Sequence, residues 1–245
     1  MTPRKSHSTI RSSDFTLAAV QAVIFTPDVA EFTVPTLLSR VLPVYATKFD
    51  GEIQAIPLPS DAPLEIPRVV LGSMNEEWKL SATPARTDCL WSRKAEEESG
   101  VDAVQECVDI LVDYVKGGDI RVGRLALVLT RVHEVANAPQ LLVQRFCNTA
   151  SQKEPFNRSS NFEIHNHKVY QFPRTMLNVN SWVRCKSITA EVLKTGFVVV
   201  EQDLNTLTEA ANETTFDAEM ARDFFLEAMQ EANSILELYF PKEAK

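Results

Sequence analysis

The stretch TTFDAEMARDFFLEAMQEANSILELYFP, residues 214–241, sets the requirements for the rest of the fold. Its apolar side chains recur at alternating steps of three and four, so they lie on one face of a helix. Thr214 with Asp217 can cap its start, and Pro241 ends it. The face consists of Ala218, Ala221, Phe225, Ala228, Ala232, Ile235 and Tyr239, widened by Met220, Phe224, Met229, Leu236 and Phe240. So broad an apolar face predicts a covering sheet.

Length and composition indicate a cytoplasmic globular protein. The 245 residues suffice for one large domain or two small ones. The apolar share of 44% and the charged share of 24% are typical of soluble proteins. No apolar run reaches the ~20 residues that span a bilayer, so no membrane contact is expected. Residues 1–13 are polar and basic without a hydrophobic signal core, and they predict a flexible tail.

Cysteine usage agrees with a reducing compartment. The four cysteines are widely spaced, and none forms a Cys-x-x-Cys pair: Cys89, Cys107, Cys147 and Cys185. Reduced thiols are therefore predicted rather than a disulfide framework or a zinc site.

The net charge of −8 is unevenly distributed. Residues 201–245 hold three basic and eleven acidic side chains, which equals the whole net charge. Residues 145–195 hold eight basic and three acidic side chains. An acidic helix and a basic sheet can attract each other, within one chain or between copies, or both can be solvated faces.

The order of predicted elements indicates an α+β fold. In the first half the strands are expected at 14–25, 68–74, 78–82 and 87–93, with helices at about 33–49 and 101–115. In the second half the strands are expected at 120–132, 162–165, 168–172, 176–186 and 189–202, with a short helix after Asn137 and the terminal helix. Asn166-His167 is interpreted as the turn of a hairpin.

The two halves, 14–117 and 118–245, share the order β-α-β-β-β-α, with one extra strand in the second. This repeat is either a duplication at the level of architecture or a chance likeness of two α+β halves. Short connections favour an antiparallel sheet, or sheets, with helices packed on one face.

Four features resemble a known family: WKLSATP at 78–84, Arg121-Val-Gly, FVVVEQDL at 197–204, and the long terminal helix. Together they resemble a sporadically distributed family of uncharacterised prokaryotic proteins of about this length. The terminal helix of that family commonly carries a His and an Asn; Asn233 matches the Asn, whereas the four histidines lie elsewhere. The resemblance implies a defence or toxin–antitoxin gene neighbourhood and carries over no catalytic residue.

A metal site is one hypothesis for the histidines. Glu163, His165 and His167 would face the same way in one extended strand. Three such ligands can hold zinc or manganese. The turn predicted at Asn166-His167 would break that shared face.

No catalytic residue or cofactor is predicted. His133-Glu134 ends a long strand, but adjacent strand residues point to opposite faces, so a base and its carboxylate would not meet there. The chain has no Gly-x-Ser-x-Gly elbow, and its seven glycines form no phosphate-binding loop. These features favour a non-enzymatic protein.

The strand at 177–186 carries the candidate binding surface. Its apolar residues alternate with a polar row consisting of Asn178, Asn180, Trp182, Arg184 and Lys186. Sheets use such rows to stack bases and hold phosphates, and also to hold protein partners. A third interpretation packs Trp182 under a helix or loop. The sequence pI near 5.1 argues against a dedicated nucleic-acid binder.

Three functional hypotheses follow, in order of preference. The first is a protein-interaction module, the partner, antitoxin or sensor component of a prokaryotic defence or toxin–antitoxin pair. The second is a nucleic-acid-binding protein that uses the Trp182 row, and the third is a metal-dependent enzyme at His165 and His167. A homodimer through the alanine face of the terminal helix is also proposed: Ala218, Ala221, Phe225, Ala228 and Ala232.

Overall fold

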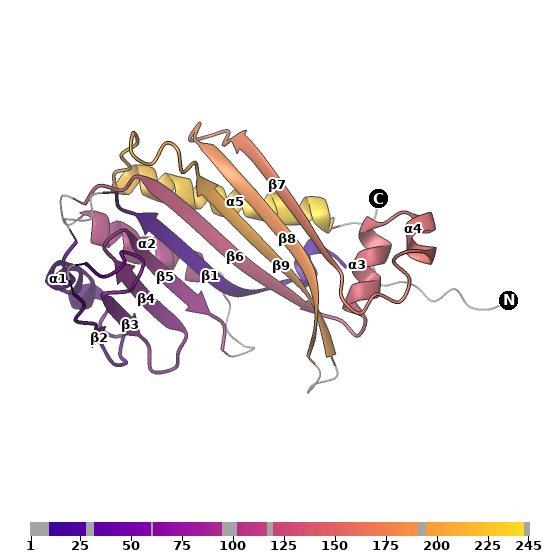
Figure 1. The fold of residues 1–245 in the computed structure, drawn as a ribbon, viewed down its shortest axis with the longest axis horizontal. Helices are drawn as coiled ribbons and strands as arrows, with labels where there is room; N and C mark the ends of the chain where they lie inside the picture. The colour runs from indigo at the N-terminus through magenta and orange to yellow at the C-terminus, as the bar shows by residue number, and fades with distance from the viewer. Residues whose placement is uncertain are drawn as a thin grey trace.

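One antiparallel sheet runs through both halves of the chain (Figure 1). The computed structural model describes residues 10–27, 32–59, 61–94, 102–116, 120–190 and 195–242. Within them nine strands pair in the order β2-β3-β4-β5-β1-β6-β9-β8-β7. Their bounds are β1 Thr16–Phe25, β2 Gln54–Ala55, β3 Val69–Gly72, β4 Trp78–Thr83, β5 Arg86–Ser92, β6 Arg124–Glu134, β7 Glu163–Gln171, β8 Asn178–Ala190 and β9 Thr195–Thr206.

Two long helices cover one face of this sheet (Figure 1). Helix α2 (Ala103–Lys116) contacts β1 and β5, and α5 (Ala218–Tyr239) contacts β6, β9 and α2. Helix α1 (Val34–Tyr45) contacts α2, and α3 (Ala138–Phe146) contacts β8, β9 and the short α4 (Thr149–Lys153). The prediction of an α+β fold with helices packed on one antiparallel face is confirmed.

The terminal helix buries the face that its periodicity predicted. Ala221, Phe225, Ala228 and Ala232 are fully buried within this one chain. The prediction of a homodimer through this face is therefore wrong, because the chain's own core already covers it. The helix also begins later than expected: Asp217 is its cap, and its Oδ1 accepts hydrogen bonds from the backbone N–H groups of Glu219 (2.9 Å) and Met220 (2.8 Å).

The two halves repeat one order of elements. The first is β1-α1-β3-β4-β5-α2 and the second is β6-α3-β7-β8-β9-α5, with β2 and α4 as additions. In the sheet they extend in opposite directions from the central β1–β6 pair. The extra strand expected in the second half is absent from its described residues, and the short β2 lies in the first half instead.

The predicted hairpin at Asn166-His167 is wrong. Both residues lie in the middle of β7, which pairs with β8 without interruption from Glu163 to Gln171. Tight two-residue turns favour glycine because their backbone requires positive φ angles, and this pair has none. In addition, the Asn166 side chain donates a hydrogen bond to the hydroxyl of Tyr239 on α5 (2.9 Å), which holds the strand against the helix.

The start of the chain is more ordered than the sequence predicts. Ile10 and Ser12, in the segment predicted to be a flexible tail, are buried, and the Ser12 N–H donates to the Phe240 carbonyl (2.8 Å). Residues 1–9 lie outside the described part.

All four cysteines are free thiols, three of them buried. Among the described helices none combines the length and apolarity that crossing a membrane requires.

Candidate functional site

The polar row of β8 lies on the sheet face opposite α5. Cross-strand pairing sets Trp182 between His167 of β7 and Asp203 of β9. By the same pairing, Arg184 lies between His165 and Glu201. The predicted alternation is confirmed, because Val179, Val183 and Cys185 point to the opposite, buried side. We call the β7–β8–β9 part of this surface, from Glu163 to Asp203, the open face.

Trp182 is the aromatic centre of the open face. It is 46% exposed, and the ring of His167 stacks on it with centroids 4.0 Å apart and planes 9° apart. The same imidazole contacts Asn180 Oδ1 through Nε2 (3.2 Å). A hollow of about 380 Å³ lies beside the indole, lined by residues that include Val128, Glu201 and Asp203. Trp182 is thus held in place by one imidazole and still presents surface to solvent.

The cations of the row are already paired with carboxylates. Arg184 contacts Glu163 Oε1 through Nε (3.0 Å) and Glu201 Oε2 through Nη1 (3.4 Å). Lys186 Nζ contacts Glu201 Oε1 (2.8 Å). Exposed pairs of this kind contribute at most about 1 kcal/mol each to stability. They do, however, neutralise the positive charge that phosphate binding would need.

His165 and His167 contact different neighbours on the open face. His165 Nε2 contacts Glu163 Oε1 (2.6 Å), whereas His167 turns toward Trp182. No group of three or more His, Cys, Asp or Glu side chains among the described residues is placed to hold an ion. Glu163, His165 and His167 do share one strand face, but their side chains contact different neighbours, and a metal site at these residues stays a prediction.

His133 and Glu134 are likewise separated. His133 Nδ1 contacts the Asp14 carbonyl (3.0 Å), and Glu134 accepts a hydrogen bond from the Thr195 hydroxyl (2.7 Å). Each side chain thus has its own neighbour at the end of β6, as expected for adjacent residues on a strand.

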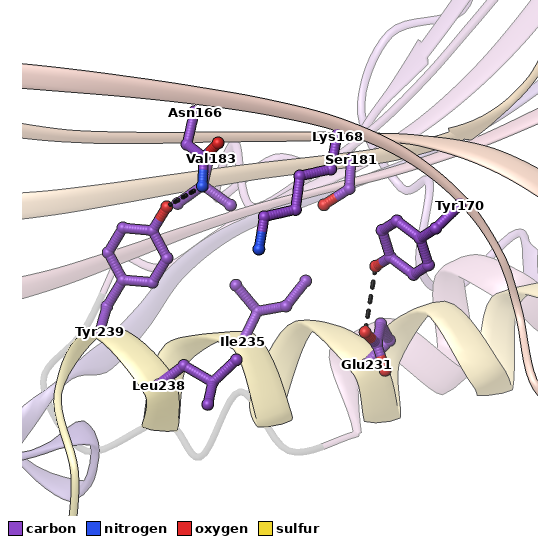
Figure 2. A pocket seen from close by; sticks show the side chains of 9 residues that line it. All are labelled: Asn166, Lys168, Tyr170, Ser181, Val183, Glu231, Ile235, Leu238 and Tyr239. Atoms are coloured by element: carbon purple, nitrogen blue, oxygen red, sulfur yellow. Dashed lines mark hydrogen bonds between the residues drawn. The ribbon is translucent and has the colours of Figure 1, made fainter.

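A cavity between β7 and α5 was not foreseen from the sequence (Figure 2). It has a volume of about 240 Å³. It lies on the side of β7 that faces α5, where Asn166, Lys168 and Tyr170 point toward the helix. Tyr170 donates a hydrogen bond to Glu231 Oε1 (3.0 Å), and burial, with a contribution from Glu231, raises the pKa of Tyr170 to about 12. Because a hairpin was predicted at Asn166-His167, the sequence did not predict that these three side chains lie on one face of a continuous strand.

Lys168 extends into this cavity from the strand (Figure 2). No hydrogen bond or ion pair joins its ammonium group to any other residue that the structure describes. Ile235 and Leu238 form the apolar floor on α5, and Leu238 is 74% exposed. The cavity therefore combines an unpaired cation with accessible apolar surface.

Two buried polar groups fix the strands beneath α5. Arg131 of β6 donates to Gln202 Oε1 of β9 and to Asn233 Oδ1 of α5 (2.6 Å), and burial lowers the pKa of Arg131 to about 10. Gln202 in turn donates to the Ala232 carbonyl (2.7 Å). Asn233, the residue noted in the family resemblance, thus has a structural contact here.

Glu227 of α5 anchors the loop between β7 and β8. Its carboxylate accepts hydrogen bonds from the backbone N–H groups of Arg174 (2.6 Å) and Thr175 (2.8 Å). Burial by itself would raise the pKa of Glu227, but the hydrogen bonds from Thr175 and Arg174 outweigh it and lower the pKa. The β7–β8 hairpin is therefore tied to the helix through a charged acceptor.

Comparison with known proteins assigns no family. No family model matches the chain, and no curated protein matches it. Among solved structures, one described as Methanococcus jannaschii TBP aligns over 89% of this chain and 98% of that one, at 12% identity and a TM-score of 0.29. A likeness at that TM-score supports no conclusion about fold or function.

Proposed function

We propose that this chain is a non-enzymatic protein-interaction module that binds a protein partner through the open face. The observation that carries the proposal is Trp182: it is half-exposed, stacks on His167, and lies on the sheet face opposite the buried residues of β8. Large aromatic side chains held in one orientation are the residues that most often dominate binding energy at protein interfaces.

The surroundings of Trp182 favour protein over nucleic acid. A single-strand binder combines stacking aromatics with free cations along the phosphate path. Here Arg184 and Lys186 both contact glutamates, and Asp203 lies opposite the indole itself. Paired charges around an aromatic centre instead match the polar rim of a protein interface.

The resemblance to sporadically distributed prokaryotic proteins supports a more specific form of the proposal. In that form, the partner is the product of a neighbouring gene in a defence or toxin–antitoxin pair, and this chain is its antitoxin or sensor component. The test is to co-express the tagged chain with each neighbouring gene product and to measure the affinity of any complex by calorimetry.

Trp182→Ala is expected to weaken such a complex by at least about tenfold, as a hot-spot truncation does. Val44→Ala is the matched control, because Val44 is 63% exposed on α1, at the opposite end of the sheet. A complex whose affinity is unchanged by Trp182→Ala would contradict the proposal. So would the absence of a complex with any neighbouring gene product. Salt-dependent binding of single-stranded oligonucleotides that is lost in Arg184→Glu would support the nucleic-acid alternative instead.

A further inference from the structure

The outer edge of β7 presents a row of backbone groups that have no backbone partner among the described residues. Backbone hydrogen bonds lie at both ends of the β7–β8 pairing: the Ser187 N–H donates to the Phe162 carbonyl (2.9 Å), and the Phe172 N–H donates to the Leu177 carbonyl (2.8 Å). In an antiparallel ladder the bonded residues alternate, so the even-numbered residues of β7 bond to β8. The N–H and C=O groups of the odd-numbered residues, 163 to 171, therefore point away from the sheet, and no backbone hydrogen bond reaches them from another described residue.

The opposite edge of the sheet is much shorter. Strand β2 has two residues, Gln54–Ala55, and Pro57 and Pro59 follow it closely. Proteins commonly blunt sheet edges with short strands and prolines, because long open edges recruit other chains. β7 extends over nine residues, and no other described strand pairs with its outer edge.

Side chains on both sides of this edge offer contacts to an added strand. On the open face Val169 is 57% exposed and follows His167 at the two-residue spacing. On the helix side Lys168 extends into the cavity floored by Ile235 and Leu238. An added strand would place alternate side chains on these two sides.

The cation at Lys168 indicates the chemistry of the occupant. A second copy of this chain, paired antiparallel about His167, would set the two Lys168 side chains diagonally across the new pair, at roughly 7–8 Å on the same side. Like charges so placed disfavour self-association in this register. An acidic side chain of a different protein would instead pair with Lys168.

We propose that an extended segment of a protein partner adds to β7 as a further antiparallel or parallel strand. It places an acidic side chain at Lys168 and an apolar side chain two residues away against Leu238 and Ile235. This inference rests on the proposed function, since it specifies how the partner is held. Main-chain hydrogen bonds supply affinity in this mode, and the alternate side chains supply specificity.

The experiment uses a phage library of random nine-residue peptides, matching the length of β7, selected on the immobilised full chain. Enriched peptides are expected to carry Asp or Glu with an apolar residue two positions away. Their affinities are then measured for the wild type and for Val169→Pro, which removes one outward N–H and no bond to β8. Val169→Thr is the matched control, because it keeps that N–H.

Val169→Pro and Lys168→Glu are each expected to weaken the selected peptides by at least about tenfold, whereas Val169→Thr and Lys168→Arg retain binding. Peptide addition should also slow hydrogen exchange of the five outward amides, with little change at the alternate amides already bonded to β8. Unchanged thermal unfolding of Val169→Pro establishes that the loss lies in binding.

Three results would overturn the strand addition. The first is equal binding of the selected peptides to Val169→Pro and wild type, and the second is a dimer of this chain that Val169→Pro dissociates. The third is a complex with a neighbouring gene product that Trp182→Ala weakens and Val169→Pro leaves intact. That third result would leave the proposed function standing, whereas the absence of any complex would remove the proposed function itself.

Discussion

Two arginines on opposite faces of the same sheet, Arg131 on β6 and Arg184 on β8, show how differently the molecule uses charge. Arg131 is 7% exposed under α5, and its described hydrogen bonds go to the neutral amides of Gln202 and Asn233. Arg184 is half-exposed on the open face, between the carboxylates of Glu163 and Glu201. Burial penalises the charge of Arg131, whereas solvent screens the pairs of Arg184.

This comparison distinguishes buried contacts that stabilise the fold from exposed contacts that are available to a binding partner. Under α5 the side chains of Arg131, Gln202 and Glu227 each have a fixed neighbour inside the chain, so changes at these residues should lower stability. On the open face the contacts are exposed and individually weak, so changes there should lower binding and leave the fold intact. Four predictions test this separation, from the largest expected effect to the smallest.

The largest contrast is between two aromatic residues. Phe225→Ala should lower the free energy of unfolding by about 3–5 kcal/mol, because Phe225 is fully buried between helix and sheet and its loss leaves a cavity. Trp182→Ala should lower it by about 1 kcal/mol or less, because its indole is half in solvent. Urea unfolding of both variants measures the difference, and equal losses would contradict the separation of the two faces.

Gln202→Leu tests the buried polar contact. It removes the acceptor of one Arg131 N–H group in a buried site and should cost about 2–3 kcal/mol. Asn233→Leu is the matched comparison and should cost less, because Asn233 lies at the surface of α5, where water can replace it. Thermal unfolding compares the two, and a larger effect at Asn233 would show that Gln202 does not hold the arginine.

Glu227→Gln should lower stability in a pH-dependent way. The folded state lowers the pKa of Glu227 below its ordinary value of 4.5, so the carboxylate contributes stability above that pH. The contribution is lost as the pH falls through the folded pKa. We expect a deficit of about 1–2 kcal/mol near pH 7 that shrinks as the solution is acidified below the ordinary pKa. Denaturant unfolding across this range checks it, and a deficit that is constant with pH would show that the charge plays no part.

The smallest effect is expected at the open-face ion pairs. Arg184→Ala should change the free energy of unfolding by less than about 1 kcal/mol, and less still at high salt, because its pairs are exposed and screened. Chemical unfolding at two salt concentrations measures this. A loss as large as that of Gln202→Leu would mean that the open face is part of the structural core.

Local patterns allowed the parts of the fold with strong periodicity to be predicted. The three–four spacing of Ala221, Phe225 and Ala228 identified α5 and its buried face, and strict alternation from Asn178 to Lys186 identified the open-face row. The neighbours of His165 and His167 could not be predicted, because ion pairing and stacking across strands depend on register. Register is a tertiary property that spacing within one strand does not contain.

Two further features differ from the sequence prediction, one at β7 and one at the start of α5. Asn166-His167 was read as a turn from residue type, although Asn166 contacts Tyr239 on a helix more than seventy positions away. With a turn predicted at this position, neither the long outer edge of β7 nor the cavity at Lys168 could be predicted. The cap at Asp217 was displaced for a similar reason: Thr214 precedes Phe216, which is buried and bridges to Val122, so the helix begins after that contact.

Hydrogen exchange across the whole chain, with and without the bound neighbouring gene product, tests the central claim most directly. We predict slowed exchange in residues 163–186, which include β7 and most of β8, and little change in β2 to β5 at the opposite end of the sheet. Protection confined to β2–β5, with residues 163–186 unchanged, would contradict the assignment of the open face and the β7 edge as the binding surface.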